Sequence, residues 1–93
     1  MLDLKKLHTF QVAAATSSFT RAAAELGCCQ SSVTVHIKAL EDELGVSLFE
    51  RRRSSKTVIL TDFGRRLLDY TGRLLALAEE TKAAFRSVRT HSG

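Results

Sequence analysis

The chain has 93 residues, of which 26% are charged, contains no proline and carries a formal net charge of +4 at pH 7. This length builds one domain of the smallest self-supporting kind, with a core too thin to enclose a buried cofactor, so we expect none. There is no apolar run long enough to span a membrane and no signal-peptide pattern, so we expect a cytoplasmic protein with no membrane partner.

The N-terminal segment from Asp3 to Thr16 is predicted to form a helix. Asp3 is placed to cap its start, and the polar run that begins at Thr16 is expected to end it. Ser18 is then available to cap a second helix that begins at Phe19. The first helix has a broad apolar face, made of Leu4, Leu7, Phe10, Val12 and Ala14.

A short helix over residues 19–27, a tight turn and a longer helix over residues 30–45 follow. Gly27 and Gly45 stand where a helix C-terminus favours a left-handed residue. Each helix has an apolar stripe at helical spacing, formed by Ala22, Ala23 and Leu26 in the first and by Val33, Ile37, Leu40 and Leu44 in the second. Two such helices must cross steeply to bury both stripes, which is the helix-turn-helix arrangement.

The turn between them holds the adjacent residues Cys28 and Cys29. Neighbouring cysteines rarely form a disulfide, so both thiols are predicted to be free. The three histidines are scattered along the chain, so the sequence predicts no metal site.

The exposed face of the helix over 30–45 suits a DNA groove. At 100° per residue, the positions opposite its apolar stripe are Ser31, Thr34, Val35, Lys38 and Asp42. The first two turns are small, polar and free of acids, which lets the backbone approach DNA, and the positive helix end favours phosphate. An ordinary solvated helix can show the same face, so the distribution of charge along the chain must distinguish a DNA-binding helix from a solvated one.

The hydrophobic pattern changes after Gly45. Two short β-rich runs, 46–51 and 56–60, flank the polar stretch 52–55 and predict a hairpin, the wing of a winged helix-turn-helix. Residues 1–50 hold four basic and six acidic residues, whereas residues 51–66 hold six basic residues against Asp62 alone. A basic patch next to a helix that fits a DNA groove indicates binding to the phosphate backbone of a nucleic acid. The six residues are Arg51, Arg52, Arg53, Lys56, Arg65 and Arg66.

Thr61 is predicted to cap a last helix from Asp62 to about Arg89, roughly 40 Å long at 1.5 Å per residue. Its apolar positions fall into two adjacent seams. One contains Leu67, Tyr70, Leu74, Leu77, Thr81, Ala84 and Val88, and the other contains Leu68, Leu75, Ala78 and Phe85.

One seam can pack on the first helix, and the other needs cover from outside the domain, most economically from a second copy. The sequence therefore predicts a homodimer through the C-terminal helix, with an interface made of Leu67, Tyr70, Leu74, Leu77 and Phe85. The alternative is a helix that frays after about Glu80 and leaves a monomer.

From about Leu4 to Glu80 the sequence resembles the DNA-binding domain of LysR-type transcriptional regulators, which are bacterial winged-helix proteins. The matching residues are Phe10, Ser18, Phe19, Thr20, Ala22, Ala23, Leu26, Gln30, Ser31, Ile37, Leu40, Glu41, Leu44, Gly45, Leu48, Phe49, Arg51, Leu60, Thr61 and Gly64.

This resemblance implies a mainly α fold, with a winged helix-turn-helix over 1–61 and a linker and dimerisation helix over 62–90. It also implies antiparallel pairing of that helix and a dyad-symmetric DNA site. An effector-binding domain would lie outside this chain, and a small-molecule effector would act only through that domain.

We therefore expect sequence-specific binding of double-stranded DNA, with helix 30–44 in the major groove and the wing on the backbone and minor groove. The predicted base-reading residues are Gln30, Ser31, Thr34, Val35, Lys38 and Arg53. The predicted backbone contacts are Ser32, His36, Arg51, Arg52, Lys56, Arg65 and Arg66. Arg53 is preferred to Arg52 for the minor groove, although alternation along the hairpin does not fix which of the two faces DNA.

Three positions depart from the family pattern. Cys29 stands where a serine usually caps the recognition helix, and Ser47 stands where proline is common. Many relatives carry a basic residue near Val35, which here can offer only apolar contact. The alternative functions are a winged-helix module for protein–protein contact and an enzyme. No nucleophile elbow, Walker loop or paired carboxylates occur in the sequence, so we predict that the chain is not an enzyme.

Overall fold

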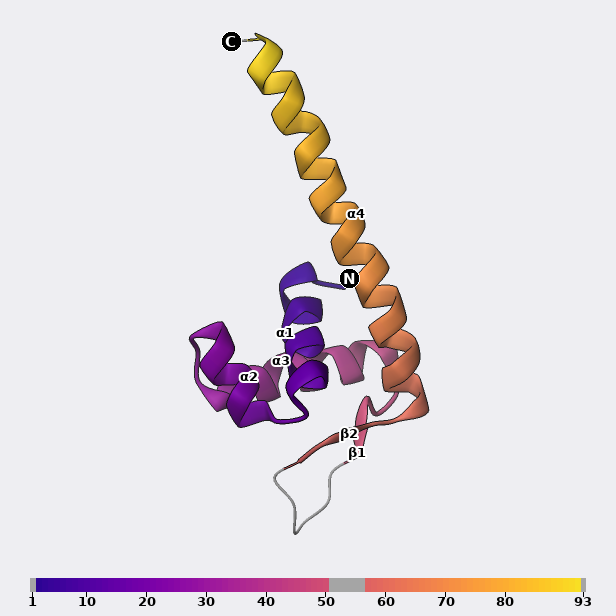
Figure 1. Cartoon of the computed structure of the whole chain (residues 1–93). Helices are drawn as coiled ribbons and strands as arrows, with labels where there is room; N and C mark the ends of the chain where they lie inside the picture. The colour runs from indigo at the N-terminus through magenta and orange to yellow at the C-terminus, as the bar shows by residue number, and fades with distance from the viewer. Residues whose placement is uncertain (1, 51–56, 93) are drawn as a thin grey trace.

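The computed structural model describes residues 2–50 and 57–92, with side chains up to residue 86 of the last helix. Its elements in chain order are α1 (Leu4–Thr16), α2 (Phe19–Leu26), α3 (Gln30–Leu44), β1 (Phe49–Glu50), β2 (Ile59–Leu60) and α4 (Asp62–Ser92) (Figure 1). The two strands form an antiparallel pair. The predicted mainly α, winged helix-turn-helix fold is confirmed.

Side-chain caps begin three of the helices. Asp3 accepts a hydrogen bond from the Lys5 amide at 2.8 Å. Ser18 accepts one from the Arg21 amide at 3.1 Å, and Thr61 accepts one from the Gly64 amide at 3.0 Å. These bonds satisfy amides that have no partner inside the helix. The three predicted caps are therefore confirmed.

The helix C-termini use the left-handed region of the backbone. Gly27 and Gly45 have φ of 68° and 73°, as predicted from their positions. Ser17 ends α1 in the same conformation, with φ of 54°, although it is not glycine. This conformation was not predicted, because serine rarely adopts a positive φ.

The core is built around Phe49, whose ring lies 5.6 Å from that of Phe10 and 5.3 Å from that of Phe19 between centroids. All three helices of the N-terminal half, the start of the wing and α4 contribute to it. The buried apolar residues are Leu7, Phe10, Ala13, Phe19, Ala22, Ala23, Val33, Ile37, Leu40, Leu48, Phe49 and Leu67.

Leu4 and Leu44 differ from the prediction. They were placed in the apolar stripes of the first and third helices, but they are 45% and 39% exposed. Both lie at a helix end, where the stripe extends past the elements that pack against it.

The wing is shorter than predicted. In the described part of the hairpin, Phe49 pairs with Leu60 and Glu50 with Ile59, whereas the runs 46–51 and 56–60 were expected to be strands. The backbone on either side has other partners. The Leu48 carbonyl accepts from the Thr61 amide, and the Val58 amide donates to the Ser17 carbonyl, both at 3.0 Å. These bonds hold the base of the wing to the rest of the domain.

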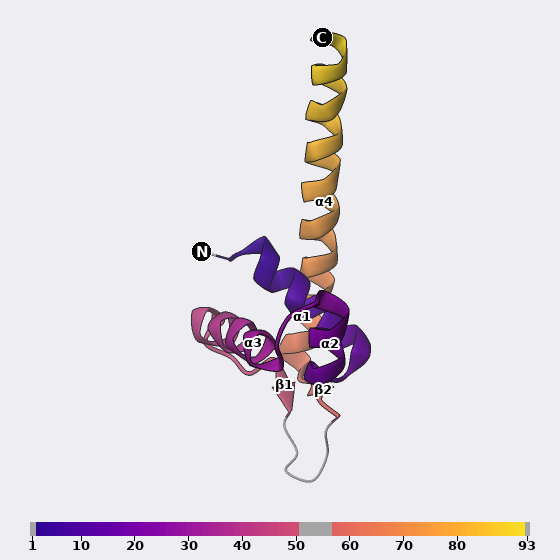
Figure 2. The same ribbon diagram turned by 90° about the vertical axis from the view of Figure 1, so that its left-hand side faces the viewer.

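Helix α4 packs its first half on the domain and projects beyond it (Figures 1 and 2). The elongated molecule measures 57 × 26 × 19 Å along its principal axes. Gly64, Leu67 and Thr71 are buried on the packed face, and Leu68, Leu75 and Ala78 are half-buried. The Thr71 hydroxyl is fully buried without a hydrogen-bond partner among the described residues.

This packing corrects the predicted seams of α4. Leu67 was assigned to the dimer interface, but it is only 7% exposed and belongs to the core of its own domain. Phe85 was grouped with the second seam, but it is exposed, as are Tyr70, Leu74 and Leu77 of the first. The exposed large apolar residues of the described part of α4 are Phe63, Tyr70, Leu74, Leu77 and Phe85. Neither predicted seam included Thr71, although this residue is buried on the packed face.

Candidate nucleic-acid interface

Helix α3 presents one rigid, polar face to solvent. Val33, Ile37 and Leu40 are buried on its inner side, and Ser31, Val35 and Lys38 are exposed on the outer side, as predicted. In both ribbon views α3 and the wing lie at the end of the molecule away from the free end of α4 (Figures 1 and 2). This end can therefore meet a ligand without obstruction from α4.

Gln30 opens α3 and is held by a residue that the sequence analysis did not single out for this role. The Thr20 hydroxyl of α2 donates to the Gln30 side-chain oxygen at 3.2 Å. This bond orients the amide and leaves its NH₂ group free to donate to a base acceptor. Thr34 donates its own hydroxyl to the Gln30 carbonyl at 3.2 Å, so that its oxygen remains as an acceptor.

His36 links α3 to α1 on the flank of the interface. Its Nδ1 lies 2.9 Å from the Thr9 hydroxyl, and Thr9, which is buried, also donates to the Lys5 carbonyl at 3.2 Å. This structural role was not foreseen. The ring is half-buried, as is Ser32 beside it. The predicted contacts of these two residues with a DNA backbone stay predictions.

The start of α3 has no side-chain cap. Cys29 occupies the N-cap position, and its side chain makes no capping hydrogen bond. Its carbonyl accepts from the Ser32 amide at 3.0 Å. Cys28 and Cys29 are both free, as predicted, and both are exposed.

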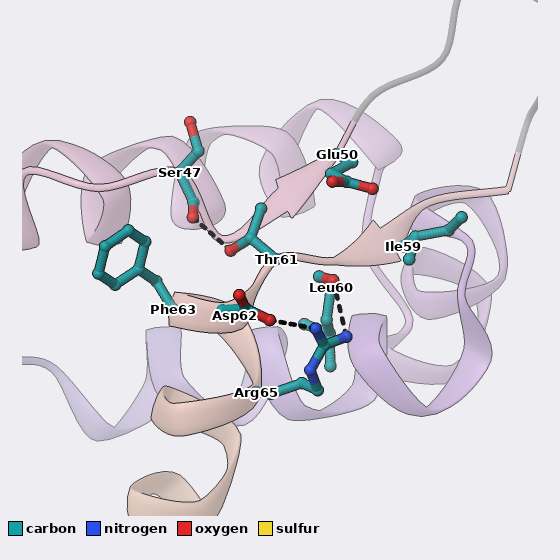
Figure 3. A pocket seen from close by; sticks show the side chains of 8 residues that line it. All are labelled: Ser47, Glu50, Ile59, Leu60, Thr61, Asp62, Phe63 and Arg65. Atoms are coloured by element: carbon teal, nitrogen blue, oxygen red, sulfur yellow. Dashed lines mark hydrogen bonds and ion pairs between the residues drawn. The ribbon is translucent and has the colours of Figure 1, made fainter.

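The base of the wing encloses a shallow hollow of about 550 Å³ beside the N-terminus of α4 (Figure 3). Within it, the Arg65 guanidinium donates to the Asp62 carboxylate and to the Leu60 carbonyl at 3.3 Å. Thr61 donates to the Ser47 carbonyl at 2.6 Å. These bonds fix Arg65 at the edge of the hollow with further N–H donors to spare. Arg66 is exposed.

The remaining basic residues of the patch lie outside the described residues. These are Arg51, Arg52, Arg53 and Lys56. Their predicted contacts with the DNA backbone and minor groove stay predictions.

Glu41 has a structural role that the sequence analysis missed. Its carboxylate accepts a hydrogen bond from the Leu48 amide at 2.8 Å, which ties the end of α3 to the strand that follows. In the sequence Gly45 marked the helix end, but nothing pointed to this bond between residues seven positions apart.

Near the middle of α4, Arg73 is paired with Asp69, and its guanidinium lies 4.9 Å from the Tyr70 ring centroid. The hydrogen bond and charge of Asp69 raise the pKa of Arg73. It lies outside the basic patch of residues 51–66.

Other kinds of site find little support in the part of the chain that the structure describes. It brings together no group of three histidine, cysteine or acidic side chains able to hold a metal ion. Across residues 2–50 and 57–92, no helix has the length and apolar character needed to cross a bilayer.

Comparison with known sequences gives a consistent family. The family model described as "Bacterial regulatory helix-turn-helix protein, lysR family" matches residues 4–65. The chain is 45% identical over 92 residues to the uncharacterized HTH-type transcriptional regulator YwqM of Bacillus subtilis, covering 99% of this chain and 31% of that protein. It is 44% identical over 88 residues to the HTH-type transcriptional regulator CitR of the same organism, covering 95% and 30%. The chain thus spans about a third of the length of these relatives.

Solved structures agree with the sequence relatives. The CbnR_DBD–DNA complex superposes with a TM-score of 0.88 at 30% identity, covering 94% of this chain and 98% of that one. The BenM_DBD/catB site 1 DNA complex gives a TM-score of 0.86 at 30% identity, covering 94% of each chain. CbnR, titled a LysR family transcriptional regulator, gives 0.86 at 30% identity, covering 92% of this chain and 29% of that one.

Proposed function

This chain belongs to the LysR family of bacterial regulatory helix-turn-helix proteins, and from that premise we propose that it binds double-stranded DNA sequence-specifically as part of a transcriptional regulator. The observation that carries the proposal is the outer face of α3. It is acid-free and, apart from the exposed Val35, polar over its first two turns, and the buried stripe on its inner side fixes it rigidly to the core. The CbnR_DBD–DNA and BenM_DBD/catB site 1 DNA complexes, in which proteins of the same fold bind DNA, support it. Such a regulator acts in the bacterial cytoplasm, where the chromosome lies.

We place α3 in the major groove with its N-terminal turns on the base edges, as in other helix-turn-helix proteins. Gln30, Ser31, Thr34, Val35 and Lys38 are then the base-reading residues. The orientation of the Gln30 amide by Thr20 supports this assignment, because a fixed donor discriminates between bases better than a mobile one.

The wing is proposed to hold the DNA backbone and the minor groove. Arg65 supports this, since its guanidinium is already oriented at the wing base by Asp62 and Leu60. We assign phosphate contacts to Ser32, His36, Arg51, Arg52, Lys56, Arg65 and Arg66, and a minor-groove contact to Arg53.

The functional form is proposed to be a homodimer paired through α4, with the two helices antiparallel. The support is the exposed apolar stripe of Tyr70, Leu74, Leu77 and Phe85, to which the structure adds Phe63. On a monomer this stripe would leave a contiguous apolar surface exposed to water, and pairing of two helices with C2 symmetry would bury it in both copies.

The curated relatives are about three times as long as this chain. We propose that residues 62–90 link the DNA-binding part to a further domain of the whole regulator. Any response to a small-molecule effector is assigned to that domain.

The proposal is tested by selecting duplexes from a random library with the purified chain and comparing binding to the selected and random sequences. We expect Gln30→Ala to lower the preference for the selected duplex by roughly 1–3 kcal/mol, because it removes a base contact. Lys56→Ala and Arg65→Ala should weaken binding to both duplexes alike, because phosphate contacts carry no sequence information.

Equal loss on both duplexes for Gln30→Ala would show that α3 is oriented differently on DNA. Failure of the chain to enrich any sequence, together with binding to a folded protein partner, would instead favour a winged-helix module for protein–protein contact.

A further inference from the structure

Val35 is an apolar side chain placed in the middle of an otherwise polar surface. It is 62% exposed and lies in the second turn of α3, on the same face as Ser31 and Lys38. Leu44, the other exposed large apolar residue in this fully described helix, lies at its far end. In the first two turns of α3, Val35 therefore offers the largest free apolar surface.

The exposure of Val35 serves neither the stability nor the solubility of the domain. A β-branched residue is a slightly poorer helix former than the charged or polar residues usual at such a position. Its side chain belongs to no part of the hydrophobic core. Its chemistry therefore points to a partner that covers it.

The neighbouring side chains favour a close approach at this point. Ser31, one turn earlier on the same face, is small. Thr34 turns its hydroxyl back onto the Gln30 carbonyl at 3.2 Å, so it does not reach outward as a donor. A base edge can thus come against Val35 itself.

Among the groups that base pairs present in the major groove, the apolar one is the 5-methyl group of thymine. A valine against a G·C pair would remove water from hydrogen-bond donors and acceptors of the bases without replacing the lost hydrogen bonds, which is unfavourable. Against thymine, the same valine buries two apolar surfaces together.

We propose that Val35 reads a thymine in each half-site by contact with its 5-methyl group. This inference rests on the proposed DNA-binding function and names the chemical group that one of its residues selects. Burial of one methyl group corresponds to about a fourfold change in affinity, and two half-sites to about fifteenfold.

The test uses the duplex enriched from a random library, with each thymine replaced in turn by deoxyuridine, which removes only the methyl group. For the native chain we expect one symmetry-related thymine pair at which replacement in one half-site weakens binding about fourfold. For Val35→Ala the same replacement should have little effect. The variant should fold, because Val35 is exposed and alanine is the better helix former.

Two further arms sharpen the assignment. Leu44→Ala shortens the other exposed apolar side chain of α3, at the far end of the helix and outside the assigned binding residues, and it should retain the full sensitivity to deoxyuridine. A 5-methylcytosine·guanine pair at the assigned position should bind more tightly than cytosine·guanine by about the same fourfold factor.

The inference is overturned if the native chain selects a sequence whose thymines all tolerate deoxyuridine. It is also overturned if Val35→Ala keeps the sensitivity, or if Leu44→Ala loses it. In each of these outcomes specific DNA binding itself still stands, whereas failure to enrich any duplex would contradict the proposed function instead.

Discussion

Cys29 leaves the first turn of α3 without the side-chain oxygen that usually caps a helix. Its backbone has the extended conformation of an N-cap residue, with φ of −80° and ψ of 151°, but its thiol makes no capping bond. The backbone of residue 29 therefore already has the conformation in which a side-chain oxygen could accept a hydrogen bond from an amide of the first turn of α3.

We expect Cys29→Ser to raise the free energy of unfolding by roughly 0.5–1 kcal/mol, because a hydroxyl accepts from a free amide of α3. Urea denaturation followed by circular dichroism measures it. Cys28→Ser, at the exposed neighbouring position that caps no helix, is the matched control and should change stability little. A neutral or negative effect of Cys29→Ser would show that the thiol contributes packing that serine cannot replace.

Gly64 is required because α4 begins in close contact with the chain that precedes the wing. A Cβ atom at this position would lie 2.2 Å from the Leu48 carbonyl oxygen and 2.8 Å from a Leu60 methyl group. The first of these neighbours is backbone, which cannot move aside easily.

Gly64→Ala should therefore destabilise the domain by about 1–3 kcal/mol through overpacking. Gly72→Ala, in the same helix with nothing within 4 Å of its added Cβ, should stabilise by about 0.5–1 kcal/mol through helix propensity. Denaturation midpoints of the two variants give both values. Equal effects for the two substitutions would contradict the close contact.

At the scale of the element, α4 has two adjacent apolar faces, of which one is buried against its own domain and the other is exposed. One packs on its own domain through Leu67 and Thr71. The other leaves Leu77 and Phe85 57% and 66% exposed, although both are large and apolar. The second face is the one available to another copy.

We expect the native chain to sediment as a dimer and Leu77→Glu to sediment as a monomer, because a charge cannot be buried unpaired between two helices. Ala76→Glu introduces the same charge at an exposed position away from the stripe and should remain a dimer. Analytical ultracentrifugation at matched concentrations distinguishes the three. A native chain that stays monomeric even when bound to DNA would refute pairing through α4 and favour the fraying alternative.

At the scale of the whole molecule, the distribution of charge governs how binding depends on salt. The net charge of +4 is concentrated in residues 51–66, where six basic residues face a single acid. A patch of this kind binds phosphates by releasing counterions from DNA.

With about three or four phosphates neutralised per subunit, a dimer should show a slope of roughly −5 to −7 for log K against log[salt]. Titrations from low to moderate salt with a fixed duplex measure it. Arg66→Ala should make the slope shallower, whereas Arg73→Ala, outside the patch and paired with Asp69, should leave it unchanged. A slope near zero would be incompatible with binding through the phosphate backbone.

The sequence by itself determined the features that depend on residues close together in the chain. The caps at Asp3, Ser18 and Thr61 and the left-handed ends at Gly27 and Gly45 follow from bonds across a few residues. The inner and outer faces of α3 follow from its 3.6-residue period. The local motifs were specific enough to identify the LysR family from the sequence.

Only the tertiary structure decided which distant groups meet. The Thr9–His36 and Glu41–Leu48 hydrogen bonds and the burial of Thr71 bring together groups whose pairing no periodicity encodes. The same holds for Leu67, because two adjacent apolar faces on α4 are equivalent until α1 packs against one of them. The direction of that packing depends on the close contact at Gly64 and on the bonds at the base of the wing, and these contacts exist only once the chain has folded.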